Sequence, residues 1–469
     1  MIWLLREKAT RKQESYELVL LEELVPKDHV LRKIARAVDF GFIHNLCKDL
    51  YCPDNGRPAV EPEVLFKMLF IGYLFGIKSE TRLVEEIECN VAYRWFLGLG
   101  LREKVANHAT ISVNRSRRFR DNNIAEKVFD EILRQAKEAG LVGGAITYTD
   151  STHIKAKANK HRKTLIHADQ TPKSYLADLD EQIERDRAVL GKKPFDKDDD
   201  QQPPTTPRMQ STTDPDSGQL SKEGKPDGFH YSEHRTVDSK YNIIVNSYVT
   251  AANIHDVTPL PQILEQVTRR LGAKPQYMGL DAGYHFAHCA RLFYTQGIQP
   301  VIGYRRHTFK TPYYGKWRFH YDFDQDVYLC PEKKPLYWKT TNRAGYREYY
   351  SNPKLCRNCP RRTQCFSSTA TRRQVTRHVW QDWLDKATAF TKSPSGKRIY
   401  HWRKQTIEPS FAESKENHTL RTARMVGIAN VREQCFLTCA VQNMKKIAKV
   451  FFTLFRPFTT TFPVPSFCL

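Results

Sequence analysis

The sequence between residues 145 and 155 reads Ala145-Ile146-Thr147-Tyr148-Thr149-Asp150-Ser151-Thr152-His153-Ile154-Lys155, and the architecture can be argued outward from it. Its β-branched and aromatic residues predict a strand that ends on the carboxylate of Asp150. Five cations follow without an intervening acid, namely Lys155, Lys157, Lys160, Arg162 and Lys163. An acid at a strand end that faces a cationic run suits a metal ion with a phosphate beside it. A buried strand that ends in a solvated turn would show the same pattern, so this stretch alone does not distinguish a metal site from a structural turn.

Charge and length narrow the class of protein. The chain has 469 residues, which predicts roughly two to four domains rather than one hydrophobic core. Lys and Arg number 74 against 52 Asp and Glu, giving a net charge of +22, and this excess predicts a polyanionic partner. No basic amphipathic anchor stands out and no apolar run is long enough to span a bilayer, so nucleic acid is favoured over a membrane. We expect a soluble cytoplasmic protein associated with the nucleoid.

The pattern of elements predicts an α/β protein. Residues 1–140 read as mostly helical, with strongly apolar or amphipathic helices at 61–76 and 79–89. Residues 141–304 give the strand above, a hairpin of strands at 231–237 and 241–251, a helix at 259–271, a strand at 277–280, a helix at 285–296 and a strand at 298–304. Antiparallel strands followed by strand–helix units predict a mixed sheet flanked by helices.

Two insertions and a helical end complete the predicted organisation. Residues 155–228 read as an insertion with one helix at 174–190 and a flexible polar stretch at 197–228. Residues 305–399 form a second insertion that is aromatic, basic and cysteine-bearing, and residues 400–455 turn helical and rejoin the sheet domain. The apolar stripe of the last helix reads as core. Residues 456–469 form a tail.

A basic helix is predicted shortly before the first strand. It carries four cations, Arg115, Arg117, Arg118 and Arg120, just after Asn107-His108-Ala109-Thr110-Ile111-Ser112. Such a helix could lie on a DNA backbone or in a groove, and the alternative is a solvated basic face. The net charge of the chain favours contact with DNA.

Three acids stand where a metal site would need them. Asp150 and Asp281 each end a predicted strand, and Glu408 is expected at the start of a helix with Pro409 just inside it. Carboxylates from separate elements can converge on two Mg²⁺ or Mn²⁺ ions, because hard oxygen ligands select these metals. Taken singly, each acid also reads as an ordinary turn residue or helix-start charge.

Several stretches share their pattern with one family. Val25-Pro26-Lys27-Asp28-His29, Gly56-Arg57-Pro58 and the 107–112 segment occur in the first part, Thr149-Asp150-Ser151-Thr152 and Gly279-Leu280-Asp281-Ala282-Gly283-Tyr284 in the middle. Tyr400-x2-Arg403 and Glu408-x6-Lys415 follow, with four residues between Arg403 and Glu408 where a common form of the signature has three. Together they resemble the DDE transposases of bacterial insertion sequences, over most of the chain.

The resemblance carries expectations about structure and chemistry. It implies an RNase H-like catalytic core with Asp150, Asp281 and Glu408 as catalytic metal ligands, and an N-terminal helical domain. It implies that an activated water cuts a phosphodiester at a transposon end and that the freed 3′-OH then attacks target DNA. It also implies that the protein binds double-stranded DNA as a homodimer, and that this DNA includes both the terminal inverted repeats of the element and the target. In addition to the four arginines at 115–120, the expected DNA-binding residues are Lys155, Lys157, Tyr400, Arg403, Lys415, Arg421 and Arg424. Arg421 and Arg424 are expected on a continuation of the helix that carries Glu408.

The cysteines form a separate pattern. Cys330, Cys356, Cys359 and Cys365 lie within the second insertion, and Cys-x2-Cys is the usual half of a Zn²⁺ site. The spacings around that pair are irregular, so a structural zinc and reduced thiols in a loop-rich domain both remain open. Cys435 and Cys439 read as buried apolar residues. His255 beside Asp256 reads as a turn histidine rather than a support for a metal ligand.

Three functions therefore compete. The leading one is an insertion-sequence transposase. A nuclease of the same fold would cut DNA without strand transfer. A DNA-binding regulator with a degenerate core would use only the N-terminal helices, and the presence of all three acids argues against it.

Overall fold

The computed structural model describes residues 19–52, 54–55, 58–169, 175–195, 205–221, 227–304 and 312–454. The chain divides into two compact units, Met1–Ile132 with Ala440–Leu469, and Leu133–Cys439. The predicted tail at 456–469 lies outside the described residues.

The first unit is helical, as predicted. Its helices are α1 (Leu21–Leu24), α2 (Val30–Ala37), α3 (Phe42–Cys47), α4 (Pro62–Leu74), α5 (Glu80–Cys89), α6 (Val91–Leu97) and α7 (His108–Asn114), with most of α8 (Ile124–Glu138) and a short 3-10 turn at Lys48–Leu50. Helix α4 is apolar on all sides and is therefore buried almost throughout, so it forms the centre of the unit. The side chains of Ser79, Asn90 and Asn107 cap α5, α6 and α7 by accepting backbone N–H groups.

The second unit is built on a mixed sheet. Its strands are β1 (Ile146–Lys155), β4 (Gly218–Leu220), β5 (Gly228–Asp238), β6 (Ile244–Ala251), β7 (Tyr277–Leu280) and β8 (Gln299–Ile302). They run in the order β4-β5-β1-β7-β8, and β6 also pairs with β5. The β1–β5 and β5–β6 pairs are antiparallel, whereas β1–β7 and β7–β8 are parallel. The predicted hairpin and the two strand–helix units are confirmed.

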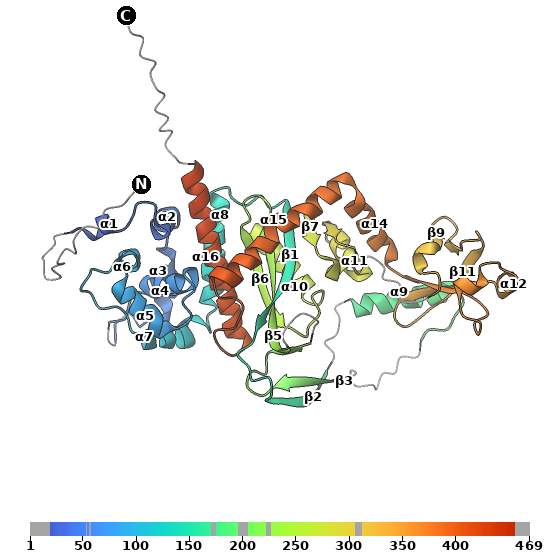
Figure 1. Ribbon diagram of the computed structural model, residues 1–469, viewed down its shortest axis with the longest axis horizontal. Coiled ribbons are helices and arrows are strands. Elements are labelled where there is room, and N and C mark those ends of the chain that lie inside the picture. The colour runs from blue at the N-terminus through green and yellow to red at the C-terminus, as the bar shows by residue number, and fades with distance from the viewer. Residues whose placement is uncertain are drawn as a thin grey trace, which may run out of the picture. The chain divides into compact units, whose positions relative to one another are not determined.

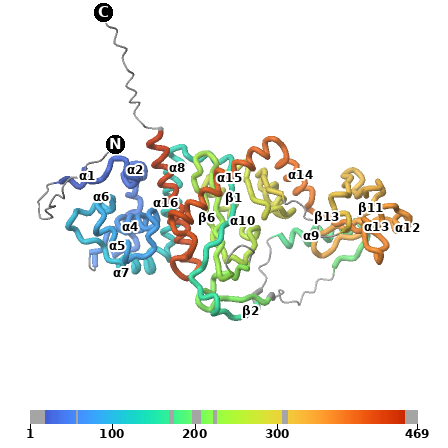
Figure 2. Tube along the Cα trace, viewed as in Figure 1, coloured from blue at the N-terminus to red at the C-terminus, as the bar shows by residue number. Residues whose placement is uncertain are grey.

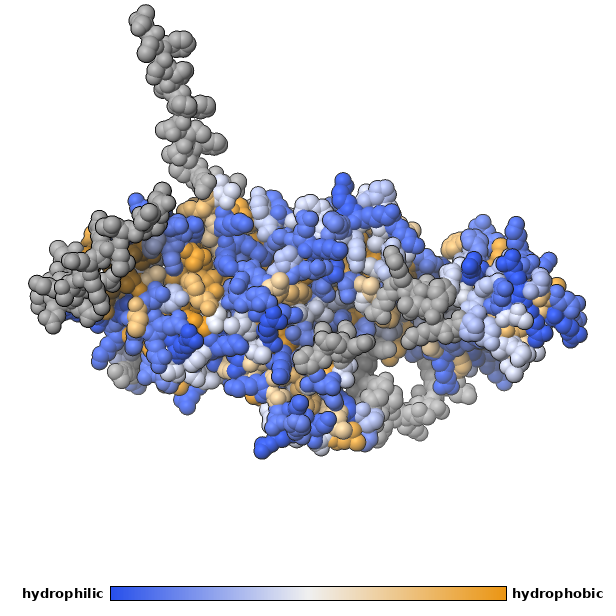
Figure 3. Space-filling view, viewed as in Figure 1, coloured by the Kyte–Doolittle hydropathy of each residue, from blue (hydrophilic) through white to orange (hydrophobic). Residues whose placement is uncertain are grey.

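Helices cover both faces of this sheet (Figure 1). On one face α10 (Leu260–Leu271) and α11 (Ala287–Thr295) bury an apolar cluster that includes Ile263, Val267, Met278 and Phe293. On the other face α15 (Pro394–Asn417) packs on β1, β5, β7 and β8, and the first turns of α16 (Ile428–Leu454) bring Val431 and Cys435 against Tyr231. The surface over α15 is mainly hydrophilic in the space-filling view (Figure 3).

Strand β1 is longer than the sequence indicates, and Asp150 is therefore not at its end. The β1–β5 pairing continues through Asp150↔Arg235 to Lys155↔His230. Ile154 is fully buried on this extension, which explains why the strand continues past the acid. The prediction that Asp150 ends a strand is wrong, whereas Asp281 does follow β7 directly.

The first insertion is more regular than expected. The helix predicted at 174–190 is α9 (Leu176–Val189). Within the stretch at 197–228, expected to be flexible, residues 197–204 and 222–226 lie outside the described residues. The described part contains β3 (Thr205–Ser211), which pairs with β2 (Lys163–Asp169), and β4 on the main sheet. A buried carboxylate anchors it, because Asp214 accepts hydrogen bonds from the Tyr231 hydroxyl at 2.6 Å and the Gly427 N–H at 3.2 Å.

The second insertion has its own antiparallel sheet, and the path of its chain can be followed at the labels β11 and β13 in Figure 2. Strands β9 (His320–Asp322), β10 (Val327–Leu329), β11 (Pro335–Thr341), β12 (Tyr346–Ser351) and β13 (Gln374–His378) run in the order β13-β12-β11-β10-β9, with α12 (Pro353–Arg357) and α13 (Arg362–Cys365) between β12 and β13. Asp186 of α9 pairs with Arg347 of β12 at 2.6 Å, so the two insertions contact each other. The chain then returns through α14 (Gln381–Lys392), whose Leu384 and Ala387 join the sheet core.

Helix α15 begins earlier than predicted. It starts at Pro394 with Ser393 as its cap, so Glu408 lies inside the helix and the prediction that Glu408 opens it is wrong. Pro409 has no N–H to donate to the carbonyl of Gln405. The amide of Asn242 donates to that carbonyl at 3.1 Å instead, which lets the helix continue through the proline.

The helix also ends earlier than predicted. Its last residue is Asn417, and Thr419 has a φ of 60°, so Arg421 and Arg424 lie in the following loop rather than on a continued helix. Hydrogen bonds explain this path. The Lys155 N–H donates to the Arg421 carbonyl at 3.1 Å, and the Ala423 N–H donates to the Lys155 carbonyl at 2.8 Å, so the loop is held at the end of β1.

Close packing at Gly279 is testable. A Cβ at Gly279 of β7 would lie 2.4 Å from the ring of Tyr148, which cannot turn away easily because its hydroxyl donates to the Ile399 carbonyl at 2.9 Å. We expect Gly279→Ala to lower the free energy of unfolding by about 1–3 kcal/mol, the usual cost of overpacking. Urea denaturation measures this, with Gly100→Ala as the control, since its nearest atom would be 3.8 Å away. Equal stability of the two variants would contradict the packing argument.

Candidate active site

Two of the predicted acids lie side by side on neighbouring parallel strands. The β1–β7 register ends at Thr149↔Leu280, so Asp150 and Asp281 are the next residues on the two chains. Asp150 accepts the Ser151 N–H at 2.8 Å, and Asp281 accepts the Gly283 N–H at 2.8 Å. A Cβ at Gly283 would lie 2.9 Å from the Asp281 carboxylate, so only glycine lets the backbone approach this acid so closely.

Glu408, the third predicted acid, is linked to Asp150 by the side chain of Arg403. Arg403 of α15 donates to Asp150 at 2.6 Å and to Glu408 at 3.2 Å, so one guanidinium bridges two of the predicted ligands. Arg403 and Asp150 are mostly buried, at 15% and 18% exposed, whereas the Glu408 side chain is 47% exposed. The extra residue between Arg403 and Glu408 does not prevent this contact.

The electrostatics of Asp150 follow from these neighbours. Burial raises the pKa of Asp150, the cation of Arg403 opposes that rise, and the carboxylate of Asp281 adds to it. Two acids this close favour sharing a cation, because their charges repel each other. In the described structure Arg403 gives Asp150 a cation, which it shares with Glu408.

Tyr400 and Lys415 of α15 also face this region. The Tyr400 hydroxyl would lie 2.3 Å from a Cβ at Gly303, so it packs on bare backbone just past β8. Burial raises the pKa of Tyr400, and Asp281 and Asp150 both act in the same direction. Lys415 is half-buried; burial and Arg421 lower its pKa, while Glu233 and Asp150 oppose this. Both side chains are therefore within electrostatic reach of the acids.

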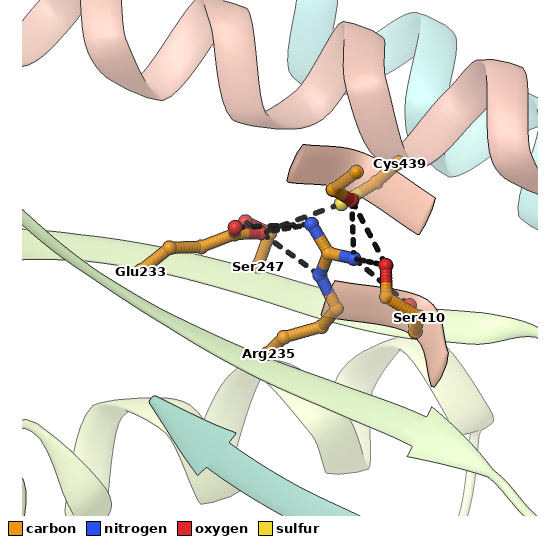
Figure 4. A network of polar contacts seen from close by, with 6 residues as sticks. Glu233, Arg235, Ser247, Ser410 and Cys439 are labelled. Carbon is orange, nitrogen blue, oxygen red and sulfur yellow. Dashed lines mark hydrogen bonds and ion pairs between the residues drawn. The ribbon is translucent and has the colours of Figure 1, made fainter. Parts of the chain in front are cut away.

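A buried ion pair holds α15 in this position. Arg235 of β5 donates from Nε and Nη2 to Glu233 at 3.0 and 2.9 Å, and from Nη1 to the hydroxyls of Ser410 and Ser414, both at 2.8 Å. Figure 4 shows Glu233 and Arg235 pointing from β5 toward α15 and α16. Ser247 and Cys439 donate to the same Glu233 oxygen at 2.8 and 3.5 Å. Arg235 lies opposite Asp150 in the strand pairing, so it supports the helix on the same face of the sheet, beside Asp150.

Sequence reasoning missed this network. The signal was present in β5 as a run of polar residues inside a strand, Ser232-Glu233-His234-Arg235-Thr236, and all of them are buried. Such a run in a central strand requires internal partners.

Burial also lowers the pKa of His234 to about 4, with Asp256 at 3.8 Å opposing it. His255 accepts the Val257 N–H at 3.3 Å and so serves a turn, as predicted.

The remaining predicted DNA-binding residues of this unit are at its surface. Lys155 and Lys157 are exposed at and just beyond the end of β1. Arg421 pairs with Glu416, and Arg424 donates to Thr419 at 3.2 Å.

One cavity in the second insertion is lined by all four cysteines of the predicted zinc pattern, namely Cys330, Cys356, Cys359 and Cys365.

The four arginines of the first unit have different surroundings. The cations at 115–118 lie on a π-helical turn after α7, at Arg115–Phe119. Arg115 pairs with Glu80 at 2.5 Å, and Arg118 donates to Asn114 at 2.6 Å while stacking over Tyr51. Arg120 pairs with Asp121 at 3.2 Å. Arg117 is the exposed member of the set, so a uniformly solvated basic face does not describe this segment.

The carboxylate oxygens of Asp150, Asp281 and Glu408 are suitable ligands for divalent cations, although these side chains are not arranged around a common metal position. Within the described ranges, no three His, Cys, Asp or Glu side chains are arranged to hold a metal ion. At the acids, the Arg403 guanidinium lies between Asp150 and Glu408 where a cation is favoured.

None of the helices in the described part of the chain is both long and apolar enough to cross a membrane.

Comparison with known families now bears on this geometry. Residues 19–117 match a family model described as a transposase domain (DUF772), and residues 329–448 match one described as a transposase DDE domain. The chain is a relative of the DDE transposases of insertion sequences. No curated protein matches the sequence. The second match includes Tyr400, Arg403, Glu408 and Lys415 of this transposase but does not reach Asp150 or Asp281, so the placement of those two acids rests on the fold.

The buried ion pair of the transposase makes a sharp prediction. Arg235 and Glu233 are both fully buried, so Arg235→Met leaves a carboxylate without its cation. Breaking one side of such a pair costs about 3–5 kcal/mol of unfolding free energy, more than replacing both sides. We expect the double variant Arg235→Met/Glu233→Met to be more stable than Arg235→Met alone in urea denaturation. A single variant as stable as the unmodified protein would show that the pair does not hold α15.

Proposed function

We propose that this transposase cuts phosphodiester bonds at the ends of an insertion sequence and joins the freed ends to target DNA, with Asp150, Asp281 and Glu408 as its metal-binding acids. One observation carries the proposal. Arg403 and Asp150 are 253 residues apart in sequence, yet one guanidinium contacts both Asp150 and Glu408, and Asp281 adjoins Asp150 on the next strand. A mixed sheet with helices on both faces is also what an RNase H-like core requires.

The residues fit the metals that this chemistry uses. Three carboxylates offer only hard oxygen donors, which suits Mg²⁺ or Mn²⁺. The guanidinium between two of them acts as a stand-in cation. When bound, the metal pair would stabilise the attacking and leaving oxygens of an in-line displacement. Arg403 orients Asp150 and Glu408 through its hydrogen bonds, and Gly283 holds Asp281 through its N–H.

Cations around the acids would position the DNA. Lys415 lies within the electrostatic reach of Asp150, and Lys155 and Lys157 are exposed at the end of β1. Phosphate contacts of this kind fix the register of a duplex without reading its sequence. We assign binding of the terminal repeats to the N-terminal helical unit, where Arg117 is exposed, and expect two copies of the chain to act on a pair of ends.

A cleavage and joining assay tests the function. The substrates are a labelled duplex with an end sequence taken from the DNA flanking the gene, Mg²⁺, and a target plasmid. We expect cleavage and joining by the unmodified chain, and neither from Asp150→Asn, Asp281→Asn or Glu408→Gln, with end binding changed by less than about threefold because the acids make no phosphate contact. Asp180→Asn, which changes an exposed acid of α9 away from these residues in the chain, is the control that should keep full activity.

The other outcomes identify the competing functions. Cleavage without joining would make the protein a nuclease of the same fold. Specific end binding with no cleavage at any Mg²⁺ or Mn²⁺ concentration would make it a DNA-binding regulator. Activity retained in any one of the three acid variants would remove that acid from the site.

Lys415 allows a separate test of positioning. It lies seven residues after Glu408 on the same helix, which is about 10.5 Å along the axis and nearly the same face. A charged contact to a phosphate is worth about 1.5–3 kcal/mol, so we expect Lys415→Ala to slow cleavage roughly tenfold to a hundredfold at saturating Mg²⁺. Mn²⁺ binding, measured by calorimetry, should stay unchanged. Lys397→Ala, near the exposed start of α15, is the matched control, and equal rates in the two variants would leave Lys415 a solvated lysine.

A further inference from the structure

The cysteines of the second insertion converge although they come from different elements. Cys330 follows β10, Cys356 belongs to α12, Cys359 lies in the turn after it, and Cys365 ends α13. All four line one cavity, together with Leu336 of β11.

The backbone presents these sulfurs in tight turns. At the β10–β11 hairpin the Cys330 N–H donates to the Lys334 carbonyl at 2.9 Å, and the Lys334 N–H donates to the Cys330 sulfur at 3.4 Å. At the second pair, the Cys359 N–H donates to the Cys356 carbonyl at 3.3 Å. One backbone N–H is thus aimed at the Cys330 sulfur, and both turns bring their cysteines to the same cavity.

The segment that carries three of the four cysteines buries little apolar surface. Helices α12 and α13 have five and four residues, contain no buried residue, and are too short to be stable alone. Leu355 of α12 is 49% exposed, so it does not anchor the helix. The nearby apolar cluster has only five buried members, among them Phe319, Tyr328 and Leu336. Small subdomains with so little core usually need a metal or a disulfide.

The charges around the cavity favour a dication bound by thiolates. Lys334, Arg361, Arg362 and Arg373 line it beside the cysteines, and nearby cations stabilise thiolates. Arg373 donates to the carbonyls of Cys365 and Tyr314 at 2.9 and 2.7 Å and so closes one wall. Four thiolates carry more negative charge than one dication neutralises, and these side chains supply the balance.

We propose that Cys330, Cys356, Cys359 and Cys365 bind one structural Zn²⁺ ion. Four cysteines fill all the positions of a tetrahedral site, which makes the ion structural rather than catalytic. As they stand, the described side chains are not drawn together around a metal, so binding requires the thiols to turn inward on the cavity they share. The ion fastens α12 and α13 to the β10–β11 hairpin. This site is independent of the proposed DNA chemistry, because none of its ligands belongs to the acid cluster.

Metal analysis of the full chain tests the proposal. Protein purified under reducing conditions with Zn²⁺ in the medium should contain about one zinc per chain, released by a thiol-modifying reagent into a chromogenic chelator. Cys359→Ser should lower the zinc content at least several-fold. Cys359→His should retain it, because three cysteines and one histidine also form a structural site, and this variant separates loss of a ligand from loss of the fold.

Two controls locate the ion. Cys89→Ser changes an exposed thiol of the first unit and should leave one zinc per chain. Asp150→Asn should also leave it, which excludes zinc held by the carboxylates. Reduced protein without stoichiometric zinc, equal zinc in Cys359→Ser and Cys89→Ser, or a disulfide among the four cysteines in mass spectrometry would each overturn the proposal.

Discussion

The buried guanidinium of Arg235 fixes how α15 lies on the sheet. It is fully buried and shares its donors between Glu233 on its own strand and two serines of α15. An unpaired charge in that place would be very unfavourable, so the helix is stable only where Ser410 and Ser414 meet the guanidinium. The ring of Phe411 adds a further contact 4.8 Å from the guanidinium carbon. The rotation and height of α15 on the sheet follow from this set of contacts.

That placement brings the chemistry-bearing residues together. Glu408 lies two residues before Ser410 and Lys415 one residue after Ser414, so fixing the serines fixes both. Arg403 then reaches Asp150 from the same helix, and Tyr400 packs on Gly303 at the end of β8. Two arginines thus have different tasks: Arg235 holds the helix from within the protein, and Arg403 occupies the space between the acids. Pro409 fits into this helix because Asn242 satisfies the carbonyl that the proline leaves without a donor.

The second insertion follows a different principle of stabilisation. The sheet domain is held by large apolar clusters on both faces, whereas the insertion has a small aromatic cluster and two very short helices. It contacts the first insertion through Asp186 and Arg347, a pair that the sequence gives no reason to expect. Four cysteines around one cavity supply the cross-link that such a poorly covered segment needs.

The sequence by itself determined the helical first part, the hairpin and the two strand–helix units, and it singled out the three acids as candidates, because all of these rest on local periodicity and short motifs. It misplaced Asp150 and Glu408 within their elements, since the length of β1 depends on pairing with β5 and the length of α15 on a carbonyl satisfied by Asn242. It also missed Glu233 and Arg235, whose burial has no local signature other than a polar run in a strand. Only the tertiary structure decided that these charges lie beside Asp150 under α15, because a buried ion pair is stable only when distant segments provide all its partners.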